Sequence, residues 1–187
     1  KWVQSAYWNG LEYCLSDLPW VPKSTLDAGC GDGTYLAALG SFYRWSSLDA
    51  IEFDEKLLGA AQVCHPCRVQ YKQIQSGDVF PYEDRQFDLV VSHSALNYVE
   101  SQELWLEQLA RVAADAVLVS SLSDAAYPLI RLMNPSHSNL NGRQKPLQSC
   151  SPALIRNYFE ATGFKRVSHC APFPYDIQLF QRDDALS

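Results

Sequence analysis

Apolar residues recur along this chain with two periods, one typical of short buried strands and the other typical of amphipathic helices. Runs of strand length alternate with helical stretches and fall at residues 24–28, 47–53, 68–75, 86–93 and 116–122. Two further runs, 164–170 and 175–182, predict an antiparallel pair at the C-terminal end. Regular alternation predicts an α/β fold, so we expect a doubly wound, mostly parallel seven-stranded sheet with an antiparallel C-terminal strand.

Capping residues predict where the helices begin and end. Ser101 is a good N-cap, because its hydroxyl can accept a hydrogen bond from a backbone N–H of the first turn. Ser151 followed by Pro152 predicts a second start, and Gly163 predicts where that helix stops. Two more helices are expected, at residues 33–42 and 55–63.

Two segments interrupt the alternation within what we expect to be one domain spanning residues 1–187. Residues 1–23 place leucines at helical spacing beside several aromatic residues. They predict either a helix packed on the domain or a lid over a ligand cleft, with Tyr7 and Trp8 facing the substrate. Residues 128–148 are rich in turn-forming and polar residues, which predicts an irregular insertion that could form part of a substrate site.

The charge of the chain excludes some partners. With 15 basic and 21 acidic residues the formal net charge is −6, so we expect no nucleic-acid partner. No apolar run reaches the length of about 20 residues that spans a bilayer, and no secretory signal opens the chain. We therefore expect no membrane span and a cytoplasmic location.

The six cysteines are expected to be free thiols in that compartment. Cys64 and Cys67 have the two-residue spacing of redox and zinc motifs, but no second pair accompanies them to complete four ligands. A surface loop closed by Pro66 is the favoured interpretation, and no metal site is predicted.

Residues 26–36 carry the most chemical information, because they hold three alternating glycines. Asp27 lies two positions before Gly29, and Gly31 and Gly33 follow before a helical pattern begins. Glycines let a strand turn sharply, and their missing side chains let a ligand lie against the backbone. The N–H groups that open the following helix would point at that ligand, so the turn predicts a site for a nucleotide-like molecule.

Acidic residues follow the next two strands, where ligands of open parallel sheets bind. Glu52 ends the second strand about twenty residues after the glycine turn, and its carboxylate could accept hydrogen bonds from both hydroxyls of a ribose. Asp78 follows the third strand and could accept from an exocyclic amine of a base, while Phe53 and Val79 pack on the faces of that base. Together with the glycine turn, these positions predict a nucleoside site.

In this order and spacing, the motifs resemble those of class I S-adenosylmethionine-dependent methyltransferases of the small-molecule type. The resemblance covers residues 26–122, with a looser match at 151–164. It implies a Rossmann-like methyltransferase fold and S-adenosylmethionine (SAM) as cofactor. It also implies where the parts of the cofactor bind: the methionine end at Asp27, Gly29 and Gly31, the ribose at Glu52, the adenine at Asp78 and Val79, and the methyl group beside Ser92.

The chemistry of SAM limits what the protein must do. Its methyl group is electrophilic, so direct in-line displacement needs mainly proximity, and a base is needed only if the acceptor arrives protonated. His93 is the first candidate for that base, because it should lie at the carboxyl end of a strand near the methyl group. His137 is the second candidate.

Other residues are candidates for binding the methyl acceptor. Tyr7, Trp8 and Tyr98 could form walls of the substrate site. Arg131 stands out in an acidic chain and could bind a carboxylate or phosphate of the acceptor, together with Arg143 and Lys145.

Three alternative functions stay open at this point. A nicotinamide-dependent oxidoreductase would need a third glycine at Thr34, and Asp27 would repel its pyrophosphate. A polyamine synthase has a similar glycine turn, but no acidic cluster is clearly placed for its substrate. The third alternative is a non-catalytic binding subunit with the methyltransferase fold. We therefore expect a methyltransferase with a small-molecule acceptor, whose identity, like the oligomeric state of the protein, the sequence leaves open.

Overall fold

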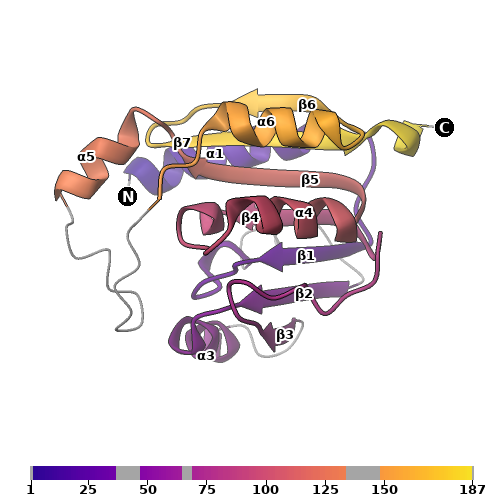
Figure 1. Ribbon diagram of the computed structural model, residues 1–187, viewed down its shortest axis with the longest axis horizontal. Coiled ribbons are helices and arrows are strands. Elements are labelled where there is room, and N and C mark those ends of the chain that lie inside the picture. The colour runs from indigo at the N-terminus through magenta and orange to yellow at the C-terminus, as the bar shows by residue number, and fades with distance from the viewer. Residues whose placement is uncertain (1, 37–46, 65–68, 134–147, 187) are drawn as a thin grey trace.

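A seven-stranded sheet runs through the middle of the described part of the molecule (Figure 1). The computed structural model describes residues 2–36, 47–64, 69–133 and 148–186. The strands are β1 (Ser24–Ala28), β2 (Ser47–Glu52), β3 (Gln70–Gln73), β4 (Phe87–His93), β5 (Ala113–Leu122), β6 (Phe164–Cys170) and β7 (Tyr175–Arg182).

The order of the strands across the sheet is β3-β2-β1-β4-β5-β7-β6. Strands β1 to β5 pair in parallel, whereas β7 is antiparallel to both of its neighbours, β5 and β6. The predicted doubly wound, mostly parallel sheet with an antiparallel C-terminal strand is therefore confirmed. Chain order reverses between β1 and β4, and the loops that leave two such strands diverge to form a crevice.

Helices cover both faces of this sheet (Figure 1). Helices α4 (Gln102–Val112) and α6 (Pro152–Ala161) lie on one face, where Trp105, Leu109 and Phe159 join a large hydrophobic cluster. Helix α1 (Trp2–Ser16) lies on the opposite face, and α3 (Glu55–Cys64) packs against β2 and β3. Two short 3₁₀ turns are also present, η1 (Ala95–Asn97) and η4 (Asp183–Leu186).

The predicted helix signals are confirmed by their geometry. Ser101 Oγ accepts a hydrogen bond from the backbone N–H of Leu104 at 3.2 Å, and Ser151 Oγ accepts one from Ala153 at 3.3 Å. Gly163 follows α6 with a φ of +86°, in the left-handed region that favours glycine. Short polar side chains and one glycine thus set the limits of α4 and α6.

Three elements differ from their predicted limits. Strand β3 is shorter than the predicted 68–75, because it is an edge strand of mostly polar, incompletely buried residues. Strand β5 begins at Ala113, directly after α4 ends, rather than at residue 116. The predicted helix over 33–42 is helical at 34–36, and residues 37–46 lie outside the described residues.

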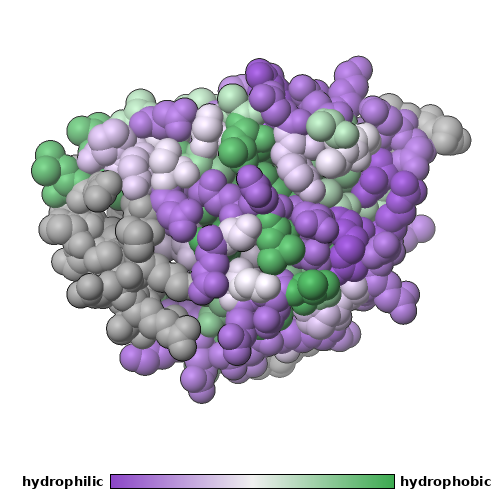
Figure 2. Space-filling view, viewed as in Figure 1, coloured by the Kyte–Doolittle hydropathy of each residue, from purple (hydrophilic) through white to green (hydrophobic). Residues whose placement is uncertain are grey.

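The segment predicted to be an irregular insertion begins as a helix, so the prediction was wrong for residues 128–133. Helix α5 (Ala126–Met133) holds Pro128 in its first turn, where a backbone N–H has no intrahelical partner to lose. Apolar side chains remain on its surface, since Leu129 and Leu132 are 51% and 80% exposed, and apolar atoms gather over α5 in Figure 2. Residues 134–147 lie outside the described residues.

Of the two alternatives for residues 1–23, the structure shows a helix packed on the sheet. Helix α1 contacts β6 and β7, and its Tyr7 and Leu11 are buried in a cluster with Leu89 and Leu179. Among the described residues, no helix combines the length and apolarity that crossing a bilayer requires.

Candidate functional site

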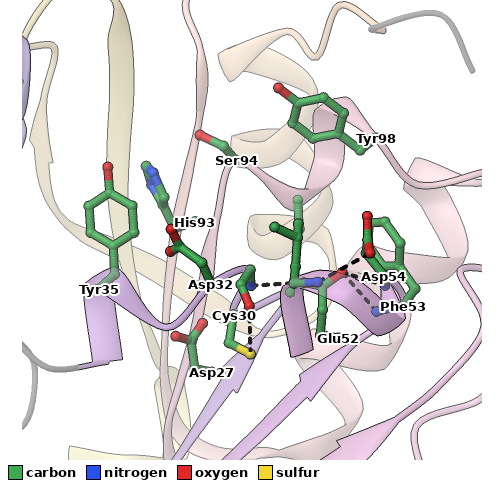
Figure 3. Close-up of a pocket in the computed structure, with 14 residues that line it drawn as sticks. Asp27, Cys30, Asp32, Tyr35, Glu52, Phe53, Asp54, His93, Ser94 and Tyr98 are labelled. Atoms are coloured by element: carbon green, nitrogen blue, oxygen red, sulfur yellow. Dashed lines mark hydrogen bonds between the residues drawn. The ribbon is translucent and has the colours of Figure 1, made fainter. Parts of the chain in front are cut away.

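A pocket of about 280 Å³ opens at the carboxyl ends of β1, β2 and β4, where the strand order reverses (Figure 3). This volume is close to the lower end of the range for small-ligand sites. Fourteen residues line it: Asp27, Gly29, Cys30, Gly31, Asp32 and Tyr35 from the first turn, Glu52, Phe53, Asp54 and Leu57 from the second, and His93, Ser94, Ala95 and Tyr98 from the third.

The glycine turn follows the tight path that its sequence predicts. Gly29 has a φ of +82° and donates its N–H to Ile51 O at 2.8 Å, and Gly31 has a φ of +58°. A Cβ at Gly29 would lie 2.5 Å from Cβ of Ala95, so no side chain fits there without displacing a neighbour. Gly29 therefore lets the turn pack closely against Ala95, whereas a Cβ at Gly31 would meet nothing within 4 Å, so the backbone beside Gly31 is open at the pocket.

Glu52 ties the glycine turn to strand β2. Its Oε2 accepts the N–H of Gly31, and its Oε1 accepts those of Phe53 and Asp54, each at 2.8 Å (Figure 3). Burial raises the pKa of Glu52, while the three N–H donors act in the opposite direction. An ionised carboxylate has about four acceptor positions, so one remains for a ligand hydroxyl.

Asp27 is buried on the floor of the pocket with one oxygen unsatisfied. Its side chain is 1% exposed, and Oδ1 has no hydrogen-bond partner among the described residues. Burial, and next the nearby charge of Glu52, raise its pKa to about 7. A buried acceptor without a partner is costly, and a cationic N–H donor on a ligand would satisfy it.

His93 lines the pocket from the end of β4, and its side chain is hydrogen-bonded to Ser120 of β5. Its Nδ1 is 2.6 Å from Ser120 Oγ, and that hydroxyl is 3.1 Å from Tyr7 Oη. The imidazole packs between Tyr7 and Tyr35, with ring centroids 4.1 and 3.9 Å away. Burial lowers the pKa of His93 to about 3, so the ring is neutral at physiological pH.

Ser94 holds an unusual backbone conformation beside the imidazole. Its φ is +54° and ψ is 4°, in the left-handed region, which a non-glycine residue adopts at a cost of about 1–3 kcal/mol. Its Oγ is buried and has no hydrogen-bond partner among the described residues. Strain and an unsatisfied hydroxyl at a pocket wall are typical of a functional residue.

Replacing Ser94 with Gly should therefore stabilise the protein and impair its activity. We expect the free energy of unfolding to rise by about 1 kcal/mol, because glycine relieves the strain and removes the unsatisfied hydroxyl. Denaturant unfolding checks this. Arg85→Gly is the control for backbone strain, since Arg85 has a φ of 55° and does not line the pocket, and the exposed ion pair with Asp184 that it removes contributes little. Activity should fall in Ser94→Gly and not in Arg85→Gly. If Ser94→Gly gives no gain in the free energy of unfolding, the backbone at Ser94 is not strained.

Several predicted site residues do not line the pocket. Asp78 is exposed and accepts the N–H of Gln75 at 2.7 Å, which closes its own turn, and Val79 is also exposed. Ser92 lies beneath the pocket, where its hydroxyl donates to Ala28 O and accepts from Trp105 Nε1.

Only some of the predicted substrate residues line the pocket. Tyr98 lines the pocket, whereas the buried Tyr7 and the half-buried Trp8 do not. Arg131 belongs to α5, but its side chain lies outside the described part of the structure, as does all of His137.

The structure also adds residues that sequence reasoning missed. Asp32 and Tyr35 could have been found, because Asp32 lies between Gly31 and Gly33 and Tyr35 is in the helical residues that follow them. Asp54 and Leu57 likewise continue directly from Glu52. Ser94 had no local signal, since its backbone angle is visible only in the folded chain.

Comparisons with known proteins give the relatives of this chain. A family model described as a methyltransferase domain matches residues 26–119. Norajmaline N-methyltransferase of Rauvolfia serpentina is 28% identical over 127 residues, which are 66% of this chain and 42% of that protein. Ajmaline N-methyltransferase of the same species is 25% identical over 161 residues, 83% of this chain and 53% of that protein. The chain thus spans about half the length of these curated relatives.

A solved structure shares the fold. Magnesium protoporphyrin IX methyltransferase from Synechocystis PCC 6803 with bound SAH superposes with a TM-score of 0.69 at 17% identity. The match covers 96% of this chain and 83% of that one.

Proposed function

This chain belongs to the methyltransferase domain family, whose methyl donor is SAM, and from that premise we propose that it methylates a small-molecule amine. The observation that carries the proposal is the unsatisfied, buried Oδ1 of Asp27 beside a turn of bare backbone. SAM offers an ammonium group for that oxygen, and ribose hydroxyls for the acceptor position left on Glu52. The residues present fit the cofactor.

The protein's own residues would bind and orient the two reactants. Asp27 holds the cationic amino group, Gly29 and Gly31 leave room for the methionine end, and Glu52 accepts from the ribose. Phe53 and Leu57 line the adjoining wall and would contact the base, whereas the predicted adenine contacts of Asp78 and Val79 stay a prediction. Bound SAM supplies an electrophilic methyl group, so alignment of the acceptor is the main requirement.

The charges of the pocket favour a basic acceptor. Four carboxylates line it, from Asp27, Asp32, Glu52 and Asp54, and no lysine or arginine does so among the described residues. Such a site attracts amines in their protonated form and repels anions, and the amine releases this proton to solvent before its nitrogen accepts the methyl group. The two curated relatives are N-methyltransferases by name, which agrees with an amine acceptor. Binding of an anionic group through Arg131 stays a prediction.

Methyl transfer from SAM to a panel of amines tests the proposal. Norajmaline, ajmaline and tryptamine, with catechol as an oxygen acceptor, would be incubated with SAM, and methylated product would be followed by mass spectrometry. We expect an amine product together with SAM binding by calorimetry.

Other outcomes separate the alternatives. Binding of NADH without binding of SAM would contradict the proposal and favour the oxidoreductase. SAM binding without turnover of any acceptor would favour the non-catalytic subunit.

A further inference from the structure

Three side chains from distant parts of the chain form a buried hydrogen-bonded chain that ends at the pocket. Tyr7 of α1, Ser120 of β5 and His93 of β4 are joined by the contacts of 3.1 and 2.6 Å described above. Ser120 and His93 are direct partners in the register of the two strands. Tyr7 and Ser120 are both fully buried, so bulk solvent does not reach either hydroxyl.

Hydrogen bonding decides which nitrogen of His93 carries the proton. Each hydroxyl has one hydrogen to donate, and leaving it unpaired in the interior costs about 1–3 kcal/mol. If Nδ1 donated to Ser120, either Ser120 or Tyr7 would keep a hydrogen with no acceptor among the described residues. One arrangement satisfies all three groups: Tyr7 Oη donates to Ser120 Oγ, and Ser120 Oγ donates to Nδ1.

In that arrangement the hydrogen of the neutral imidazole is on Nε2. This nitrogen has no hydrogen-bond partner among the described residues, and it is not fully buried, since His93 is half-buried. It is therefore reachable from the pocket that His93 lines. In Figure 3 the tips of Tyr35, His93, Ser94 and Tyr98 lie on one side of the pocket, apart from Asp27 and Glu52.

We propose that His93 presents Nε2–H as a fixed hydrogen-bond donor to the methyl acceptor, with Tyr7 and Ser120 as positioning residues. The acceptor then carries an oxygen or an unprotonated nitrogen beyond the atom that is methylated. His93 does not act as the base, because Nδ1 is occupied and Nε2 already holds a hydrogen. The neutral ring follows from burial, and no proton needs to leave it during transfer. This inference rests on the proposed methyl transfer.

Nuclear magnetic resonance of the full chain tests the tautomer directly. Histidine nitrogens labelled with ¹⁵N show which ring nitrogen is protonated, and His93→Gln assigns the signals. We expect a single species with hydrogen on Nε2 at pH 7, and a mixture of tautomers in Ser120→Ala. Hydrogen on Nδ1 in the unaltered protein would overturn the proposal.

Two substitutions then distinguish a donor from a base. His93→Gln keeps an N–H donor near the position of Nε2 but has no basicity, whereas His93→Leu has neither property. With norajmaline as acceptor, we expect His93→Gln to retain most of the rate and His93→Leu to lose at least about tenfold. His169→Gln, a partly exposed histidine of β6 outside the pocket, is the control. Equal loss in both His93 variants would overturn the donor role.

The two proposals fail separately. If the unaltered protein does not methylate norajmaline, the proposed function fails for that acceptor, and the tautomer measurement still decides the inference. If methylation proceeds and His93→Leu keeps the full rate, only the inference fails.

Discussion

Replacing Asp27 with Asn should remove most of the affinity for SAM while making the ligand-free protein more stable. The carboxylate is buried with Oδ1 unsatisfied, so the folded protein without ligand holds an uncompensated group. An ammonium group on SAM would compensate it, and a charge-assisted bond of this kind contributes about 1.5–3 kcal/mol. Loss of that bond predicts about a hundredfold weaker binding.

The gain in stability follows from the raised pKa of Asp27. An unfolded Asp titrates near a pKa of about 3.9, and the folded one has a pKa of about 7. Between these values the folded protein binds more protons, so stability falls as pH rises from about 4 to about 7 and is constant above. The full penalty is at most about 4 kcal/mol. Asn cannot ionise and therefore avoids this penalty. Its buried amide has unpaired donors, which cost about 1–3 kcal/mol, so the net gain in stability is smaller by that amount.

Calorimetry and denaturant unfolding at pH 8 and pH 5 check both parts of this prediction. The affinity of the unaltered protein for SAM should also fall below pH 7, because a protonated Asp27 cannot pair with an ammonium group. Asp49→Asn is the control, since Asp49 is a buried carboxylate of β2 that does not line the pocket. Unchanged SAM affinity in Asp27→Asn would remove the assigned role of this residue.

The second large effect is expected at Gly29. Its φ of +82° strains any L side chain, and the Cβ of an Ala would lie 2.5 Å from Cβ of Ala95. We expect Gly29→Ala to lower the free energy of unfolding by about 3 kcal/mol or more, since both strain and overlap contribute. Denaturant unfolding measures this loss, and weaker SAM binding should accompany it.

Two further variants separate strain from overlap. Gly163→Ala has a similar φ of +86° with open space around its Cβ, so only about 1 kcal/mol should be lost. Adding Ala95→Gly to Gly29→Ala removes the overlapping methyl group. The free energy of unfolding should then recover, except for the part lost to backbone strain at residue 29. Equal losses in Gly29→Ala and Gly163→Ala would show that overlap with Ala95 is unimportant.

The side of the pocket formed by the glycine turn and the end of β2 could be predicted from the sequence because each of its segments is local. Asp27, Gly29 and Gly31 lie within one turn, and Glu52 and Phe53 end the next strand. Buried parallel strands appear in the sequence as apolar runs, and their carboxyl ends meet at one edge of the sheet. The chain's local pattern was therefore sufficient to bring these residues together.

Three other features could not be read from the sequence pattern, two of them local and one dependent on a tertiary contact. The predicted adenine contact of Asp78 stays a prediction, and the sequence did not indicate that its carboxylate closes a turn with Gln75. Pro128 looked like a break, yet the first turn of α5 accommodates it. Tyr7 and Ser120 are 113 positions apart in the chain, so their contact could not be predicted from spacing.

The hydrogen-bonded chain from Tyr7 has a consequence for how the protein can diversify. The match to the methyltransferase domain begins at residue 26, so Tyr7 lies outside the part that the family shares. Tyr7 is linked to His93 by hydrogen bonds through Ser120, and its ring also packs against that of Tyr35, which lines the pocket, with the two ring centroids 4.9 Å apart. Under the proposed donor role of His93, we expect substitutions at Tyr7 to change the preference for the acceptor more than the affinity for SAM.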